Sequence, residues 1–426
     1  MGEGVLTGPF PREAGRVLCG TSPATELVER FGTPLYVYDI QAVAERVRAF
    51  REAFAPLDPL LAYSVKANGN LAVLRRLREL GCGADVTSLG ELARALRAGI
   101  SPDAVVFAGV GKREDEITAG LEAGIRGFNV ESEGELRRIA GVAERLGVVA
   151  PVAVRVNPDV LADTPHAYTA TGHAAAKFGV PLDRVPDLYR FARDHPHLRS
   201  VGVDVHIGSQ IVDPGPYVRA LERVLELVRG LREKGVELEY LDLGGGYGIG
   251  YEGGSGMDVD LLAGEITPLV EGSGLLLILE PGRSIVGEAG VLLTRVEYVK
   301  KSGDKTFVIV DGGMSELIRP SHYGGYHAIE RADAREARPV LRLDVVGPIC
   351  ETGDFLALDR EMELPEPGEV LVVRAAGAYG FTMASNYNGR LRPAEVLVDG
   401  DDVRLIRRRE TLEDLIRPEE ELDEAP

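Results

Sequence analysis

The sequence is poor in cysteine, in positive charge and in long apolar runs, and each shortage excludes a class of protein. Cys19, Cys82 and Cys350 are the three cysteines in 426 residues, too few and too scattered for a disulfide framework or a zinc site. Acidic residues outnumber basic ones by 67 to 48, so no basic face for nucleic acid or an anionic membrane is expected. No apolar run of about 18 residues predicts a membrane helix, and the N-terminal stretch lacks the apolar core of a secretion signal. We therefore expect a cytoplasmic protein that binds neither nucleic acid nor membrane.

The composition that is present favours a globular enzyme of two domains. Hydrophobic residues make up 45% of the chain, and its mass is 45.8 kDa. A single hydrophobic core stops growing near roughly 250–300 residues, so a chain of this length is expected to divide.

Short apolar runs alternate with amphipathic helical patterns through the first two thirds of the chain. The runs lie at residues 60–65, 84–88, 104–109, 127–131, 152–157, 202–208, 238–244 and 275–280. Between them, segments such as LGELARALRAG and EGELRRIAGVAERLG place apolar residues at three- and four-residue spacing. Eight buried-type strands separated by helices predict a (β/α)8 barrel over residues 36–288. A doubly wound open sheet is the rival, but such sheets usually have fewer repeats.

After residue 290 the pattern changes to strands without intervening helices, as in VLLTRVEYVK, KTFVIVD, VLRLDVVG, GEVLVVRAAG and AEVLVDGDDVRLIRR. This pattern predicts a β-rich, β-barrel-like second domain made of residues 1–35 and 289–426. Two irregular stretches, 158–180 and 312–338, are too long for simple connections, and long loops of compact enzymes tend to carry function.

Four motifs end predicted strands of the barrel and together suggest a pyridoxal 5′-phosphate site. They are YSVKAN with Lys66, HIGSQ with His206, the triplet Gly244-Gly245-Gly246, and EPGR with Glu280 and Arg283. This cofactor needs a lysine amine to hold its aldehyde, an anion site for its phosphate and a charged partner for its ring nitrogen. Active sites of (β/α)8 barrels lie at the carboxyl ends of the strands, where phosphate commonly binds after strands 7 and 8.

Each motif has a structural explanation beside the functional one. The glycine triplet could be a flexible turn, although glycines after strand 7 also let backbone N–H groups approach phosphate, with Arg283 close by. Lys66 could extend from the rim into solvent, and Glu280 could pair with Arg283. His206 could be a hydrogen-bonded structural group, or it could stack on the cofactor ring. Asp85 could orient that histidine or the lysine.

Seven strings, in this order and over nearly the whole chain, resemble the diaminopimelate decarboxylase family. They are YSVKAN, HIGSQ, GGG, EPGR, RPSHYGGYH, GPICETGD and GAYG. This family of fold-type III pyridoxal-phosphate decarboxylases is related to the ornithine and arginine decarboxylases. The segment HAYTATGHAAAKFG (166–179) resembles a loop of the diaminopimelate enzymes and favours them over the ornithine enzymes. The resemblance implies a (β/α)8 barrel followed by a β-barrel domain, as the pattern of strands also predicts.

The resemblance, with the motifs above, gives a set of expected site residues. The catalytic residues would be Lys66, His206 and Cys350, with Cys350 as the proton donor. The cofactor would be held by Lys66, Asp85, His206, Ser209, Gly245, Gly246, Glu280, Gly282, Arg283 and Tyr379. Substrate would be bound by Arg283, Arg319, Tyr323, Glu351 and Tyr379, and no metal is expected. In this family Cys350 and Glu351 would reach into the neighbouring subunit, so the resemblance implies a homodimer with shared active sites. Without the resemblance, Cys350 would be read as a small buried apolar residue.

The expected activity is pyridoxal-phosphate-dependent decarboxylation of meso-2,6-diaminopimelate to L-lysine and CO2, the last step of lysine biosynthesis. Decarboxylases of ornithine, arginine, carboxynorspermidine or carrier-bound amino acids share most of these strings and stay open as alternatives. A racemase on the same barrel would not need Cys350 and Glu351. A non-catalytic homologue would be expected to have lost Lys66, Glu280 or Arg283, and all three are present.

Overall fold

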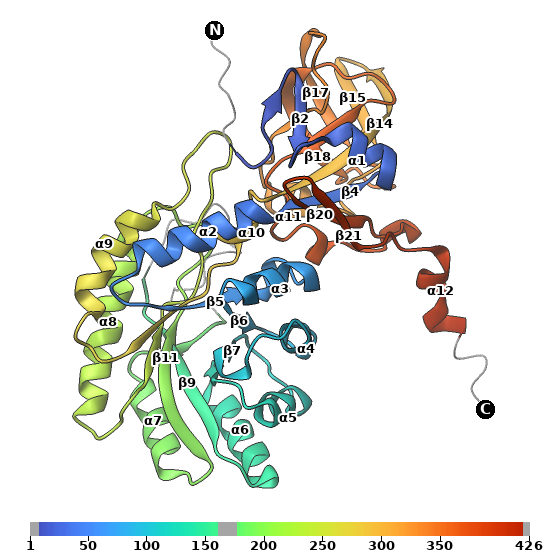
Figure 1. The fold of residues 1–426 in the computed structure, drawn as a ribbon. Coiled ribbons are helices and arrows are strands. Elements are labelled where there is room, and N and C mark those ends of the chain that lie inside the picture. The colour runs from blue at the N-terminus through green and yellow to red at the C-terminus, as the bar shows by residue number, and fades with distance from the viewer. Residues whose placement is uncertain (1–7, 161–176, 421–426) are drawn as a thin grey trace. The chain divides into compact units, whose positions relative to one another are not determined.

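The computed structural model describes residues 8–160 and 177–420, and the statements below refer to them. The chain divides into two compact units (Figure 1). The barrel unit comprises Ala44–Ile249 and Ser255–Ser284. The β-rich unit comprises Met1–Val43, Gly250–Gly254 and Ile285–Pro426. Each unit is described by itself.

Eight parallel strands of the barrel unit close into a ring, which confirms the predicted (β/α)8 barrel. They are β5 (Leu60–Ser64), β6 (Gly83–Val86), β7 (Val105–Phe107), β8 (Gly127–Val130), β9 (Ala150–Asn157), β11 (Leu198–Val205), β12 (Tyr240–Asp242) and β13 (Leu276–Leu279). Each pairs with the next in this order, and β13 pairs with β5 to complete the circle. Every one of them overlaps an apolar run in the sequence. A two-residue strand, β10 (Val180–Pro181), adds to β9.

Helices follow the barrel strands and lie outside them (Figure 1). They are α3 (Leu71–Glu79), α4 (Leu89–Arg97), α5 (Glu114–Ala123), α6 (Glu133–Leu146), α7 (Val185–Asp194), α8 (Gly215–Arg232) and α9 (Val259–Val270), preceded by α2 (Ile40–Ala53). Sequence signals set their ends. The Ser132 side chain caps α6 by accepting from the Glu135 N–H, and Gly147 ends it with a left-handed φ of 68°.

Side chains from several strands, rather than solvent, fill part of the barrel interior. Ala62, Val106, Ala153, Val201, Tyr240 and Ile278 form one buried cluster. Tyr240 fits because glycine stands at positions 127 and 202, where a Cβ atom would collide with the tyrosine ring or hydroxyl. The barrel is therefore a packed core whose chemistry is confined to one end.

The β-rich unit confirms the predicted second domain. Its main sheet contains β4 (Leu35–Asp39), β14 (Gly290–Ser302), β15 (Lys305–Val310), β17 (Val340–Val346), β18 (Phe355–Glu363), β20 (Ala394–Asp399) and β21 (Asp402–Arg407). Strand β19 (Val370–Val373) pairs with β14 and with β16 (Ile329–Arg331). A small sheet holds β1 (Arg12–Glu13), β2 (Arg16–Cys19) and β3 (Ser22–Pro23), and the helices are α1 (Ala24–Phe31), α10 (Arg283–Val286, which begins in the barrel unit), α11 (Arg319–Tyr323) and α12 (Leu412–Glu420).

The two irregular stretches in the sequence have different outcomes. Residues 312–338 contain α11 and β16, both short, within otherwise irregular chain. Most of 158–180, including most of the segment that resembles the diaminopimelate decarboxylase loop, lies outside the described residues. Among the helices that the structure describes, none has the length and apolar character needed to cross a lipid bilayer.

Candidate active site

Side chains that follow barrel strands meet at the carboxyl end of the barrel. Lys66 lies in a short 3-10 turn, Val65–Ala67, directly after β5. Asp85 lies near the end of β6, and His206 follows β11. Glu280 follows β13, which pairs in parallel with β5. Because the carboxyl ends of parallel strands face the same way, these residues share one end of the barrel, as the sequence predicts.

The Lys66 amine is held by a buried carboxylate. Its Nζ lies 3.0 Å from Oδ2 of Asp85, and the same oxygen accepts from the Ser64 hydroxyl at 2.7 Å. The Asp85 side chain is fully buried, whereas that of Lys66 is 35% exposed. An ammonium paired in this way is drawn back toward the barrel instead of extending freely from the rim, and a carboxylate at this distance can accept its proton.

The glycine triplet has a defined geometry, so it is more than a flexible turn. A Cβ at Gly245 would collide with the Glu280 carbonyl, and one at Gly246 with the Gly208 carbonyl. Buried tyrosine hydroxyls hold the preceding carbonyls, Tyr247 that of Gly244 at 3.0 Å and Tyr217 that of Gly245 at 2.9 Å. In a trans peptide the N–H points opposite to the carbonyl. The N–H groups of Gly245 and Gly246 are therefore turned away from these tyrosines, in the orientation that an anion cradle needs.

Arg283 and Gly282 complete this side of the site. Nη2 of Arg283 donates to the Ser209 hydroxyl at 3.1 Å, so two residues predicted to hold the cofactor are in contact. A Cβ at Gly282 would lie 2.9 Å from the Ser64 Cβ and 3.1 Å from the Ala67 Cβ. The turn after β13 can therefore pack against the Lys66 turn only with glycine at this position.

Three buried carboxyl groups, from Asp204, Asp242 and Glu280, lie together beneath this end of the barrel. Oxygens of the three lie within 4.8 Å of one another. Burial and then Asp242 raise the pKa of Glu280 well above its ordinary value, and burial raises the pKa of Asp242 to about 7. At this separation at least one of the three groups holds a proton. Like charges this close cannot all stay ionised.

Arg155 and Asp204, on β9 and β11, belong to the site but were missed in the sequence. Nη1 of Arg155 lies 2.8 Å from Oε1 of Glu131, and its Nε lies 3.9 Å from Oδ2 of Asp204. All three side chains are at least nine-tenths buried. The available signal was an ionisable residue inside an apolar strand, because a strand buried on both faces rarely carries a charge without a partner.

His206 is partly buried next to these charges. Burial first, and then the charges of Arg155 and Lys66, lower the pKa of His206 well below its ordinary value. The imidazole is therefore neutral at neutral pH. A neutral ring is compatible with stacking against a cofactor, since it adds no positive charge beside Lys66.

The buried carboxyl cluster makes stability depend on pH in the absence of cofactor. The pKa of Asp242 rises from 3.8 unfolded to about 7 folded, so its stabilising protonated form is complete below about pH 4 and is lost as pH rises to 7. We expect Asp242→Asn to be more stable than the wild type at pH 7.5 by roughly 2–4 kcal/mol, and by less than half as much at pH 5. Urea unfolding of the cofactor-free proteins at both pH values measures this difference.

The exposed Asp260 on α9 provides the matched control. Asp260→Asn should shift stability by less than about 0.5 kcal/mol at either pH. If the stability of Asp242→Asn followed that of the wild type across this pH range, the raised pKa of Asp242 would be contradicted.

The described residues fit pyridoxal 5′-phosphate. Oε1 of Glu280 is buried and has no hydrogen-bond partner among the described residues, which suits it to accept the N–H of a protonated pyridine ring. Lys66 supplies the amine, and the backbone at Gly245 and Gly246 supplies N–H groups for a phosphate. The group would thus meet an amine, a carboxylate and an anion cradle at one barrel mouth.

Five further predicted residues lie in the β-rich unit. Arg319, at the start of α11, is 7% exposed, and Tyr323 ends the same helix partly buried. Tyr379 is partly buried and has a left-handed φ of 56°, a conformation that costs free energy outside glycine and often marks a functional position.

Cys350 is exposed, so the interpretation as a buried apolar residue is wrong. The backbone N–H of Cys350 donates to Oδ1 of Asn388 at 2.9 Å. Its neighbour Glu351 is exposed and accepts from the Tyr387 hydroxyl at 3.1 Å. An exposed thiol next to an exposed carboxylate fits the predicted projection from this chain toward another subunit, although that projection stays a prediction.

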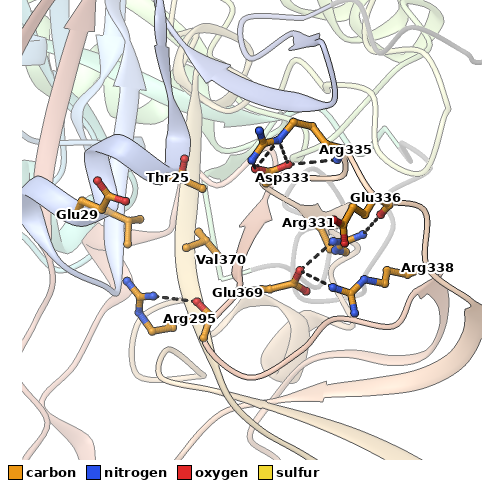
Figure 2. Close-up of a pocket in the computed structure, with 12 residues that line it drawn as sticks. Thr25, Glu29, Arg295, Arg331, Asp333, Arg335, Glu336, Arg338, Glu369 and Val370 are labelled. Carbon is orange, nitrogen blue, oxygen red and sulfur yellow. Dashed lines mark hydrogen bonds and ion pairs between the residues drawn. The ribbon is translucent and has the colours of Figure 1, made fainter.

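A cavity of about 490 Å³ in the β-rich unit is lined by none of the predicted site residues. Figure 2 shows that its arginines are already engaged. Arg331 is bonded to Glu369 at 2.8 Å, Arg335 to Asp333 at 2.7 Å, and Arg295 donates to the Gly368 carbonyl at 2.9 Å. The cavity is therefore lined by a structural network of ion pairs and hydrogen bonds.

Comparison with known proteins agrees with the geometry. Residues 40–287 match the family model described as "Pyridoxal-dependent decarboxylase, pyridoxal binding domain". A diaminopimelate decarboxylase of Neisseria meningitidis serogroup B is 51% identical over 397 residues, which cover 93% of this chain and 95% of the relative. The crystal structure of the Helicobacter pylori diaminopimelate decarboxylase complexed with L-lysine is 41% identical, with a TM-score of 0.90 over 93% of this chain and 99% of that one.

The enzyme from M. jannaschii, also in complex with L-lysine, is 38% identical, with a TM-score of 0.91 over 99% of each chain. The matched region contains the whole barrel, and the relatives extend over the β-rich unit as well. The chain belongs to the diaminopimelate decarboxylase family of pyridoxal-dependent decarboxylases.

Proposed function

We propose that this protein removes one carboxylate of meso-2,6-diaminopimelate as CO2 and releases L-lysine. The observation that carries this proposal is that a lysine amine, that of Lys66, and a buried carboxylate, that of Glu280, lie at the same end of the barrel. The relatives that share the fold support the choice of substrate, because they bear this enzyme's name and two of them bind L-lysine in crystals.

Pyridoxal 5′-phosphate supplies, when bound, an aldehyde that captures amines and a protonated ring that accepts the electron pair left by CO2. Lys66 would hold the aldehyde, and Asp85, 3.0 Å from the Lys66 amine, can take up the proton of its ammonium. Glu280 would keep the ring nitrogen protonated and so preserve the ring as an electron acceptor. The N–H groups of Gly245 and Gly246, with Arg283 and Ser209, would hold the phosphate. The neutral His206 would add no positive charge beside Lys66.

The reaction breaks one C–C bond and adds one proton to the carbon that loses CO2. We assign the proton to the Cys350 thiol of the partner subunit, since Cys350 is exposed on its own chain. Glu351 accompanies it toward substrate, while Arg319, Tyr323 and Tyr379 bind substrate from the β-rich unit. The active form is then a homodimer, and we place it in the cytoplasm.

A substrate panel tests the proposal. The purified protein loaded with cofactor should release CO2 from meso-diaminopimelate with a kcat/KM at least about 100-fold above that for lysine, ornithine or arginine. Lysine, ornithine and arginine lack the second carboxylate. Leaving a buried cation such as Arg319 without its anion lowers kcat/KM by several factors of ten. CO2 release and lysine formation are measured together, with the Lys66→Ala protein as the blank.

Faster CO2 release from ornithine, arginine or carboxynorspermidine would move the protein to another decarboxylase of the same fold. Exchange of the α-hydrogen without any CO2 release would identify a racemase. Either result would overturn the proposal.

A further inference from the structure

Arg319 is anchored by two side chains that no motif in the sequence assigned to the site. Its Nη1 donates to the Tyr251 hydroxyl at 3.0 Å and is bonded to Nε2 of His327 at 2.8 Å. The guanidinium carbon lies 5.2 Å from the centre of the Tyr251 ring. All three residues belong to the β-rich unit. Both N–H bonds of Nη1 are therefore used inside the protein.

The contacts of His327 determine which of its nitrogens carries the proton. Arginine has no acceptor, so Nε2 of His327 must accept the bond from Arg319. Nδ1 of the same ring lies 2.8 Å from the Arg374 carbonyl oxygen, which cannot donate, so Nδ1 must carry the hydrogen. His327 is thus the neutral Nδ1–H tautomer. A proton on Nε2 would set two donors and two positive charges against each other.

The side chains that hold Arg319 are themselves held, and His327 is fully buried. His327 is 0% exposed, and its own carbonyl accepts from Nη1 of Arg360 at 2.8 Å. The Tyr251 and His327 rings meet edge to face, with centres 5.8 Å apart and planes at 77°, a favoured aromatic arrangement. Since both N–H bonds of Nη1 are used within the protein, an incoming carboxylate must bind Arg319 through its other nitrogens.

We propose that His327 and Tyr251 are positioning residues that fix the plane of the Arg319 guanidinium for a carboxylate of the substrate. This inference rests on the proposed function, in which Arg319 binds substrate. Tyr251, which lies directly before the Gly-rich stretch 252–257, brings an acceptor to Arg319. The bond from Arg319 to His327 requires the neutral Nδ1–H tautomer of His327.

Kinetics of three variants test the role. His327→Phe and Tyr251→Phe each remove one acceptor from Nη1 but keep a ring, and we expect KM for meso-diaminopimelate to rise about 10- to 100-fold in His327→Phe and less in Tyr251→Phe. The value of kcat should change less than about threefold, because neither side chain is assigned to the reacting atoms. His327→Gln can present an amide oxygen to Nη1 and should restore most of the lost affinity.

His197 provides the matched control, because its Nδ1 also contacts a backbone carbonyl, that of Val148 at 2.9 Å, on the barrel surface. His197→Gln should leave KM and kcat unchanged. Equal KM values for the wild type and His327→Phe, or a His327→Gln protein as impaired as His327→Phe, would overturn the proposal.

A second measurement is independent of activity. In the wild-type holoenzyme with 15N-labelled histidine, the His327 signal should show an unprotonated Nε2 and a protonated Nδ1 at pH 7.5, with the assignment made from the spectrum of His327→Gln. A cationic ring or an Nε2–H tautomer would overturn the inference. Because this readout needs no turnover, it separates a failure of the tautomer from a failure of the proposed function.

Discussion

Lys66→Ala is expected to lower kcat/KM for decarboxylation by at least about 10³-fold, the scale of losing a nucleophile that no neighbour replaces. In the structure the amine is already 3.0 Å from Asp85, whereas Lys112, which also follows a barrel strand, is bonded to Glu135 at 2.7 Å. The variant should also lose the visible absorption of the lysine-linked cofactor. Stopped assays of CO2 release and absorption spectra measure the two effects.

Lys177 serves as a control on the loss of a lysine, since it is exposed at the edge of the described residues, and Lys177→Ala should keep the absorption band. A Lys66→Ala protein that retains both the band and turnover would show that another amine binds the cofactor.

The same variant tests whether the active sites are shared between subunits. If Cys350 acts on the partner's site, a Lys66→Ala chain and a Cys350→Ala chain are each nearly inactive, while their hybrid dimer holds one intact site. Random reassociation of equal amounts should then restore about a quarter of the wild-type activity in a two-fold symmetric dimer. Mixing that restores no activity would place Cys350 in the site of its own chain.

Glu280→Gln is expected to lower kcat on the order of 10²- to 10³-fold, the cost of removing one preorganised charge from a low-dielectric site. The amide keeps the shape of the side chain but cannot keep a ring nitrogen protonated, so the electron pair left by CO2 is less well accommodated. Affinity for the cofactor should change less than kcat, because the lysine and the phosphate cradle are intact. Pre-steady-state CO2 release and cofactor titration separate the two.

Glu280→Asp is the informative companion, because it keeps the charge and moves it by one methylene. It should recover part of kcat, whereas Glu280→Gln should not. If Glu280→Gln and the wild type had the same kcat, the buried carboxylate would have no role in the chemistry.

The barrel could be predicted from the sequence because each strand is a local signal. A strand that is mostly buried, such as β13 with the sequence LLIL, must be apolar whatever its neighbours are. Strand β18 was missed because the second half of FLALDREME is largely charged and only one of its residues is buried, so no regular alternation marks this half-exposed strand. Strand β4 was missed because its partners, β14 and β20, lie more than 250 residues away.

The site was predictable where one motif carries one function and not where two distant residues act together. Lys66 and the glycine triplet can be recognised in the sequence from their residue type and their position after a predicted strand. The raised pKa values of Asp242 and Glu280 depend on a separation that no spacing in the chain encodes. Likewise, His327 stands in the sequence as one more histidine, and its neutrality follows only from having an arginine on one nitrogen and a carbonyl on the other.

The loop after β12 and the residue after β13 are joined by the backbone alone: the Glu280 N–H donates to the Gly244 carbonyl at 2.8 Å. The Gly244 N–H in turn bonds the Asp242 carboxylate at 3.0 Å. A main-chain bond does not change with side-chain rotamer, so the backbone of Glu280 keeps a fixed distance from the glycine loop. We therefore expect a cofactor analogue with a longer or shorter phosphate arm to lose its contact with either the glycine loop or Glu280.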